Sequence, residues 1–177
     1  MPVNDDVASL AFSVAASGGQ GDHTALYLRL TQLLCWDAAM WCASREGGVV
    51  LPDPDTVYAA RPFFSLIEYG RFDGLFPPAH RTHVPTANDV YNIPAGAFVG
   101  FFECDPGATP RPKNLRHAML YCLAGHAAGS HNDTIFPNTG PQWNTRHLTD
   151  FFATAAYTVG RTHLFYTPCN GQAIPRP

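Results

Sequence analysis

Hydrophobic positions in the first third of the chain follow a helical period. Within residues 24–45 the apolar side chains recur at close to 3.6 residues, which predicts an amphipathic helix. The positions that carry this pattern are Leu26, Leu30, Leu33, Leu34 and Trp41. We expect Asp22 to cap the amino end and the Gly-Gly pair after residue 46 to end the helix. The pattern also allows a break near residues 32–34, with a second helix that begins at Cys35.

The second half of the chain changes to shorter apolar runs that are typical of strands. Residues 93–104 form a turn followed by an apolar run, which predicts a buried strand. Residues 116–133 predict two strands joined by a tight turn at Gly125, and residues 162–168 predict a final strand. A short helix is expected over 147–157. Helices first and strands later favour an α+β fold, with an antiparallel sheet packed on the helical portion.

The remaining segments carry weaker signals. Residues 49–92 are rich in loop residues, with a short helix expected over 63–69 and aromatic side chains up to Phe76 that suit a core or a cleft wall. The proline-rich stretches are too short to mark a domain boundary. We therefore expect a single catalytic domain over residues 1–177, in which residues 1–22 form an N-terminal extension.

Composition removes several classes of function. Of the 177 residues, 46% are hydrophobic and only 14% are charged, against a usual charged share of about 25%. The formal net charge is −3. A long charged tail and a basic face for nucleic acid are therefore not expected.

The start of the chain does not have the pattern of a signal peptide. Asp5 and Asp6 stand where such a peptide carries basic residues, and no stretch approaches the ~20 apolar residues of a membrane helix. We expect a protein that is made in the cytoplasm without a cleavable signal, has no membrane partner and keeps its cysteines reduced. Export by a specialised secretion system needs no cleavable signal, so the sequence is compatible with secretion by that route.

An odd number of cysteines, five, leaves at least one thiol unpaired. Cys35 on a helical segment and His117 at the start of a strand form the most informative pair. An imidazole can hold a thiol as the thiolate, and the amino end of a helix lowers the thiol pKa further. Asn132 and Asp133 follow His117 by 15 and 16 residues, so a hairpin would return one of them to the imidazole as its orienting group.

These residues predict the roles of a thiol hydrolase. Cys35 is the expected nucleophile, His117 the general base and later acid, and Asn132 or Asp133 the orienting residue. The oxyanion is expected to bind the backbone N–H of Cys35 and a donor before the helix, for which Gln32 is a candidate.

Other residues compete for a chemical role. Cys42 lies well inside the same helix and suits a small buried hydrophobic residue. His80 and His83 have the spacing of metal ligands but no matching partner pair, so neither a metal nor another cofactor is expected. His126 and His131 flank the second predicted strand, where they suit solvated turns or substrate contacts.

Two further kinds of site lack their sequence signature. Ser65 and Ser130 do not lie in the G-x-S-x-G pattern of a serine nucleophile. No glycine-rich phosphate-binding pattern of the nucleotide-binding type occurs in the chain.

Two segments, IPAGAFVGFF and RHAMLYCLAGHAAGSHND, resemble the second half of the papain-like thiol hydrolases of the NlpC-like cell-wall peptidase type. In that group a cysteine begins a helix, an apolar strand follows a Pro/Gly turn, and a histidine opens the next strand before a glycine turn and a third polar residue. The resemblance covers residues 30–45 and 92–135, about a third of the chain. The matching segments are Pro94-Ala95-Gly96, Ala97–Phe102, His117–Tyr121 and Gly125.

The same pattern is shared by bacterial amidase and deamidase toxins. Leu34-Cys35-Trp36-Asp37 stands in place of the Asp-Cys-Ser-Gly motif of the cell-wall enzymes, and Gly96-Ala97 replaces their acidic residue after the turn. The resemblance therefore implies a secreted effector that deamidates Gln or Asn side chains of a target protein, with an immunity protein as a second partner. A peptidoglycan amidase or endopeptidase is the alternative substrate class. An inactive binding module of the same fold is the non-enzyme alternative.

Overall fold

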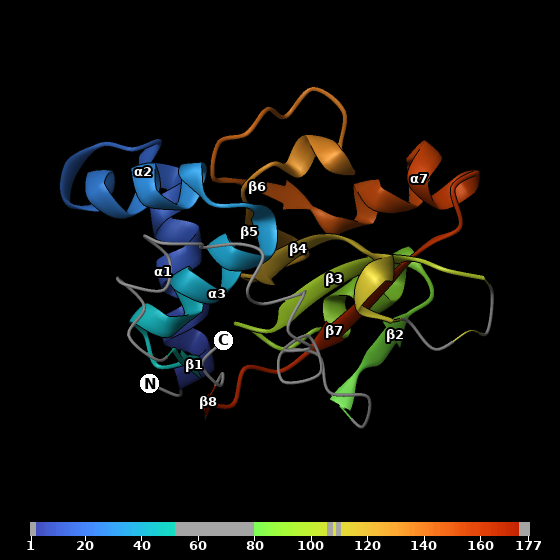
Figure 1. The fold of residues 1–177 in the computed structure, drawn as a ribbon, viewed down its shortest axis with the longest axis horizontal. Coiled ribbons are helices and arrows are strands. Elements are labelled where there is room, and N and C mark those ends of the chain that lie inside the picture. The colour runs from blue at the N-terminus through green and yellow to red at the C-terminus, as the bar shows by residue number, and fades with distance from the viewer. Residues whose placement is uncertain (1–2, 52–79, 106–107, 109–110, 174–177) are drawn as a thin grey trace.

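The computed structural model describes residues 3–51, 80–105, 108 and 111–173 (Figure 1). The short helix expected over 63–69 and the aromatic stretch up to Phe76 lie outside these described residues.

Helices dominate the start of the described chain, and shorter helices connect the later strands. The α-helices are α1 (Val3–Ser17), α2 (Thr24–Gln32), α3 (Cys35–Arg45) and α7 (Ala155–Thr158). Single-turn or two-turn 3-10 helices are η1 (Gly21–His23), η3 (Ala87–Asn92), η4 (Pro112–Asn114), η5 (Asn132–Thr134) and η6 (Leu148–Ala153).

The strands form a six-stranded antiparallel sheet in the order β2-β7-β3-β4-β5-β6 and a separate parallel pair of β1 and β8. The bounds are β1 (Val49–Val50), β2 (Thr82–Val84), β3 (Phe98–Glu103), β4 (Leu115–Tyr121), β5 (His126–Gly129), β6 (Asn144–His147), β7 (Thr162–Thr167) and β8 (Gln172–Ala173). The two predicted strands of 116–133 are confirmed as the β4–β5 hairpin, which pairs Leu120 with Ala128.

Both faces of the central strands are buried, which explains the nearly unbroken apolar run in β3. Phe98 and Phe102 pack with α1, α2 and α3 on one face, while Val99 and Phe101 pack with η3 and η6 on the other. Burying a side chain of this size contributes about 1.5–3 kcal/mol. The two cores therefore hold the sheet between the N-terminal helices and the later short helices.

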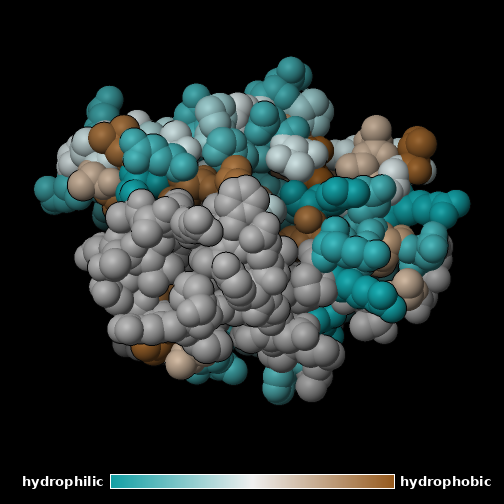
Figure 2. All heavy atoms as spheres, in the orientation of Figure 1, coloured by the Kyte–Doolittle hydropathy of each residue, from teal (hydrophilic) through white to brown (hydrophobic). Residues whose placement is uncertain are grey.

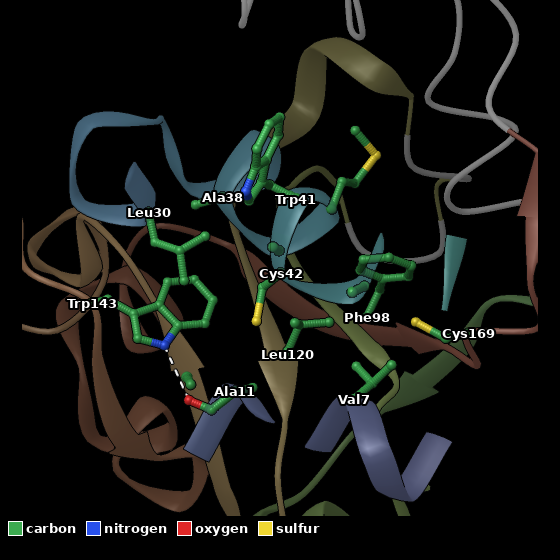
Figure 3. Packing of buried hydrophobic residues seen from close by; sticks show 14 of the residues in the cluster. Val7, Ala11, Leu30, Ala38, Trp41, Cys42, Phe98, Leu120, Trp143 and Cys169 are labelled. Atoms are coloured by element: carbon green, nitrogen blue, oxygen red, sulfur yellow. Dashed lines mark hydrogen bonds between the residues drawn. The ribbon is translucent and has the colours of Figure 1, made fainter. Parts of the chain in front are cut away.

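Helix α1 is an element that the sequence analysis did not predict. It occupies most of residues 1–22, expected there to be an extension, and its face of Val7, Ala11 and Val14 is fully buried in the core. The indole Nε1 of Trp143 donates a hydrogen bond to the Ala11 carbonyl oxygen at 3.1 Å (Figure 3). The buried face of α1 includes the small side chains of Ala8 and Ala11, which give a weak hydrophobic pattern along the chain.

The break predicted near residues 32–34 is confirmed. Leu33 and Leu34 are extended between α2 and α3, so the second helix begins at Cys35. The prediction for Asp22 is wrong: it lies in η1, and α2 begins two residues later without a side-chain cap. Gly47, with φ of 72°, ends α3, and the Gly48 N–H binds the Ala43 carbonyl oxygen at 2.8 Å.

The described part of the chain is thus a mixed α+β structure in which helices pack on an antiparallel sheet. On the face drawn in Figure 2, its hydrophobic residues reach the surface at scattered points among hydrophilic ones. Within the described ranges, no helix combines the length and the hydrophobicity needed to span a membrane.

Candidate active site

Cys35 is the first residue of α3, and its thiol is nearly completely buried, with 4% exposure. No side chain caps this helix end, because the N-cap residue is Leu34. The backbone N–H groups of the first helical turn therefore keep their partial positive charge available to an anion at this end. This is the position that the sequence analysis assigned to the nucleophile.

Burial controls the protonation of the thiol. It raises the pKa of Cys35 to about 12, and hydrogen bonding from the backbone of Ala118, Trp36 and Cys35 itself lowers the pKa only in part. We expected the helix end and the imidazole to hold a thiolate. The structure corrects this expectation for the resting site, because desolvation of the anion outweighs the backbone donors.

His117 lies inside the sheet and not at its edge. The strand β4 begins at Leu115, so His117 is its third residue, and its ring is completely buried beside Phe101 at a centroid distance of 5.6 Å. The expectation that His117 opens the strand is therefore wrong, and its ring is buried because both faces of the sheet are covered. Burial lowers the pKa of His117 to about 4, so the imidazole is neutral at pH 7.

Asn132 is the residue that binds the imidazole. Its Oδ1 lies 2.8 Å from Nε2 of His117, and Asn132 itself is completely buried. Asp133 is exposed and acts on His117 only as a nearby negative charge, which raises the imidazole pKa slightly against the dominant effect of burial. Of the two alternatives for the orienting group, the structure brings Asn132 and not Asp133 to the ring.

Hydrogen bonding of the Asn132 amide assigns the protonation of His117. The Nδ2 group of Asn132 donates to oxygen acceptors on Gly129 and Asn144, so Oδ1 is the amide atom that faces the ring. A neutral imidazole must then donate from Nε2, which leaves Nδ1 unprotonated. This Nδ1 is buried and has no hydrogen-bond partner in the described part of the chain. It is therefore free to accept a proton.

Two contacts connect the segment around Cys35 to the β4–β5 hairpin and the residue that follows it. Ala118, directly after His117 in β4, is one of the residues whose backbone hydrogen bonding favours the Cys35 thiolate. Ser130, buried after β5, donates from Oγ to the Leu33 carbonyl oxygen at 3.1 Å. The segment around Cys35 is thus hydrogen-bonded to Ala118, which follows His117, and to Ser130, which precedes Asn132 by two residues. The sequence analysis considered Ser130 only as a nucleophile. Its position in the sequence did not indicate that it binds the segment before Cys35.

Asp37 is a buried acid that the sequence analysis did not single out. It lies in the first turn of α3, is completely buried, and neither carboxyl oxygen has a hydrogen-bond partner among the described residues. Burial raises its pKa to about 9, so the carboxyl is neutral at pH 7. Its nearness to Cys35 adds to the rise of the thiol pKa. Gln32, the oxyanion candidate, is the exposed last residue of α2.

The other cysteines do not form a second reactive centre. Cys42 is completely buried in the core, where Figure 3 shows it with Cys169. Cys122 and Cys169 lie close enough to act on it, and burial raises the thiol pKa of each of the three. Cys104 is the half-buried one, and all five thiols are free. Cys42 is thus a core residue, as its position in the helix predicts.

Four of the other histidines form ring pairs across strands, and His131 acts on His117 as a nearby charge that lowers the imidazole pKa. His83 faces His163 across β2 and β7 at 5.5 Å between ring centroids, and His126 faces His147 across β5 and β6 at 4.6 Å. His131 immediately precedes Asn132 in a left-handed conformation. Within the described ranges, no three His, Cys, Asp or Glu side chains are grouped so that they could hold a metal ion.

Comparisons of the chain with protein-family models, with curated proteins and with solved structures found no match.

Proposed function

We propose that this protein is a papain-like, NlpC-like cysteine amidohydrolase in which Cys35 attacks an amide carbonyl, His117 moves the proton and Asn132 orients the imidazole. The observation that carries the proposal is the buried hydrogen bond of 2.8 Å between His117 Nε2 and Asn132 Oδ1, with Nδ1 left unpartnered. In nucleophilic catalysis by a thiol, a third group orients the base through one nitrogen and the other nitrogen receives the thiol proton. The helix that begins at Cys35 and packs on the antiparallel sheet is further support.

The resting site contains a neutral thiol and a neutral imidazole, so proton transfer accompanies attack. The Cys35 sulfur forms a bond to the amide carbon while Nδ1 of His117 takes the thiol proton. The Asn132 Oδ1 acceptor stabilises the resulting imidazolium through Nε2. Nδ1 then returns its proton to the departing nitrogen, which leaves as ammonia or an amine, and a thioester remains. Water, with His117 as the base, hydrolyses the thioester and regenerates the thiol.

Backbone groups at the start of α3 are suited to bind the developing oxyanion. The N–H groups of Cys35 and Trp36 belong to a helix end that no side chain caps, and that of Ala118 comes from β4. Donors fixed in place before the reaction stabilise charge most strongly in a site from which water is excluded. We assign the oxyanion to these groups and not to Gln32, since that side chain is exposed.

The proposed substrate is the side-chain carboxamide of Gln or Asn on a target protein, which makes the protein a deamidating effector. The thiol is only 4% exposed and the imidazole is completely buried, which favours a slender group over a peptidoglycan stem. Specialised secretion into a target cell and a protective immunity protein belong to the same proposal. Peptidoglycan hydrolysis is the alternative activity, and mass spectrometry of the products distinguishes it from protein deamidation.

A binding module that has lost activity is the second candidate. It is favoured by the same burial, because a thiol with a pKa near 12 and an imidazole with a pKa near 4 do not form an ion pair at rest. An active enzyme must transfer the thiol proton to the imidazole during attack, whereas a binding module needs no such transfer.

The test is to incubate the protein with candidate target proteins and with purified peptidoglycan, and to identify products by mass spectrometry. Deamidation replaces an amide NH₂ by OH at a defined residue, and peptidoglycan cleavage releases peptide fragments. We expect deamidation that is lost in Cys35→Ala and His117→Ala. The matched control is Cys42→Ala, which removes a buried thiol from the same helix and should keep activity. Product formation that survives Cys35→Ala would refute the proposal, and binding without any product would favour the inactive module.

A further inference from the structure

Asn144, the first residue of β6, stands behind Asn132 on the side away from His117. We propose that Asn144 is a positioning residue that orients Asn132 and through it fixes the proton of His117 on Nε2, an inference that rests on the proposed function for its catalytic meaning. Asn144 is half-buried, and its amide makes hydrogen bonds through both its nitrogen and its oxygen. Nothing in the sequence pattern pointed to it, because no strand was predicted at 144–147.

The orientation of the Asn144 amide is set by backbone oxygens. Its Nδ2 donates to the carbonyl oxygens of Thr139 and Gln142, each at 3.3 Å. A carbonyl oxygen can only accept, so a flipped amide would place two acceptors against each other. Because Nδ2 is held in this way, Oδ1 of Asn144 must face Asn132.

Asn132 receives its orientation in the same manner. Its Nδ2 donates to Oδ1 of Asn144 at 2.8 Å, to the Gly129 carbonyl oxygen at 2.9 Å and to the Asn144 carbonyl oxygen at 3.1 Å. All three partners are oxygens, and the shortest contact is the one to the Asn144 side chain. Oδ1 of Asn132 is therefore turned toward His117, where only an N–H donor can satisfy it.

The hydrogen bonds thus run in one direction, from His117 through two amides to the backbone. Each donor nitrogen points away from the imidazole and each side-chain oxygen points toward it. With Nε2 protonated, the unpartnered Nδ1 is the basic nitrogen. The opposite tautomer would set Nε2 as an acceptor against Oδ1 of Asn132 and block Nδ1 with a proton. A buried network of this kind is stabilising only when every member is satisfied.

Nuclear magnetic resonance of ¹⁵N-histidine-labelled protein tests the inference directly, since two-bond ¹⁵N–¹H correlations distinguish the protonated ring nitrogen from the unprotonated one. We expect His117 in the wild type to be the pure Nε2–H tautomer at pH 7. In Asn144→Leu we expect a second imidazole signal set and a three- to tenfold lower rate of amide hydrolysis, about the effect of losing one hydrogen bond. The matched control is Thr145→Val, the next residue of β6, which should leave the His117 signals and the rate unchanged.

The outcomes separate this inference from the proposed function. A wild-type Nδ1–H tautomer, or an Asn144→Leu protein with wild-type imidazole signals, overturns the inference whatever the activity. Loss of the single tautomer in a protein that hydrolyses no amide sustains the inference and removes the proposed function. If Asn144→Leu does not fold, Asn144→Asp replaces it. Its new negative charge should raise the acidic pKa of the pH–rate profile or of the His117 signals, and unchanged values would overturn the proposal.

Discussion

The Oγ of Ser130 donates a hydrogen bond to the Leu33 carbonyl oxygen at 3.1 Å, joining residues 97 positions apart in the chain. Leu33 precedes Cys35 by two residues, and Ser130 precedes Asn132 by two residues. This buried contact therefore links the segment that carries the nucleophile to the segment that orients the base. We therefore expect a substitution at Ser130 to change the relative position of these two segments.

Ser130→Ala should destabilise the protein by about 1–3 kcal/mol, because the Leu33 carbonyl oxygen loses its donor in a buried place. It should also lower the rate of amide hydrolysis by more than the loss of folded protein at the assay temperature explains. Chemical denaturation and the hydrolysis rate measure the two effects. Ser44→Ala is the matched control, since Ser44 Oγ binds a carbonyl oxygen within its own helix at 2.7 Å. Equal effects of the two substitutions would contradict the linking role of Ser130.

Protonation of His117 should destabilise the fold in acid. Its folded-state pKa, about 4, lies below the ordinary value of 6.5, so the unfolded chain takes up a proton first as pH falls. Above pH 6.5 the protonation of His117 does not affect the free energy of unfolding. Between pH 6.5 and 4 the unfolded chain binds a proton that the folded protein does not, and the free energy of unfolding falls by roughly 3 kcal/mol in total.

The comparison that isolates this effect is His117→Gln, whose amide can still donate to Asn132. We expect the difference in unfolding free energy between the wild type and this variant to shrink steadily as pH falls from 6.5 to 4. Urea denaturation at several pH values measures it. A difference that does not vary with pH would show that His117 keeps an ordinary pKa in the folded protein.

Asp37 should lower stability at neutral pH. Burial raises its folded-state pKa from 3.8 to about 9, so folding requires the carboxyl to take up a proton at any pH between these values. The cost grows from pH 3.8 upward and amounts to roughly 4 kcal/mol at pH 7. Asp37→Asn, which is neutral at every pH, should therefore be more stable than the wild type near pH 8 and similar near pH 4.

Thermal unfolding of wild-type and Asp37→Asn protein across this range checks the prediction. Asp89→Asn serves as a control for the loss of a charge, because Asp89 is only half-buried and its carboxylate accepts from the Thr86 backbone N–H at 3.1 Å. That substitution should destabilise the protein slightly. If Asp37→Asn also destabilises at pH 8, Asp37 is ionised and paired in solution, contrary to its burial here. Buried acids without partners are frequent at functional sites, so its effect on hydrolysis is of equal interest.

Alkylation should modify Cys104 before Cys35 in the unliganded protein. Cys104 is half-buried, whereas the Cys35 thiol is buried and has a pKa near 12. The rate at Cys35 should rise about tenfold per pH unit up to pH 10, since only the thiolate reacts. Iodoacetamide labelling followed by peptide mass spectrometry measures both rates, and Cys104→Ala removes the competing site. A fast, pH-independent reaction at Cys35 near pH 7 would mean that a thiolate–imidazolium pair exists at rest.

The sequence could predict the candidate site only as far as local spacing reaches. The hairpin between His117 and Asn132 followed from two apolar runs around Gly125, and the start of a helix at Cys35 followed from a break in a helical pattern. Asn144 and Ser130 could not be predicted, because their partners lie in other segments and their own residue types are common in turns. Helix α1 was missed for a related reason: alanines that permit close packing carry little hydrophobic signal.

By itself the sequence determined the mixed α+β class, the β4–β5 hairpin and the start of a helix at Cys35. It also suggested Cys35 and the histidine-bearing hairpin as the candidate chemistry. Each of these depends on periodicity and turn residues that act over a few neighbours. Tertiary structure decided that Asn132 and not Asp133 binds the imidazole. It also decided that the thiol and imidazole are both neutral at rest. Those properties arise from desolvation and hydrogen-bond direction, which depend on the atoms that surround a group in space.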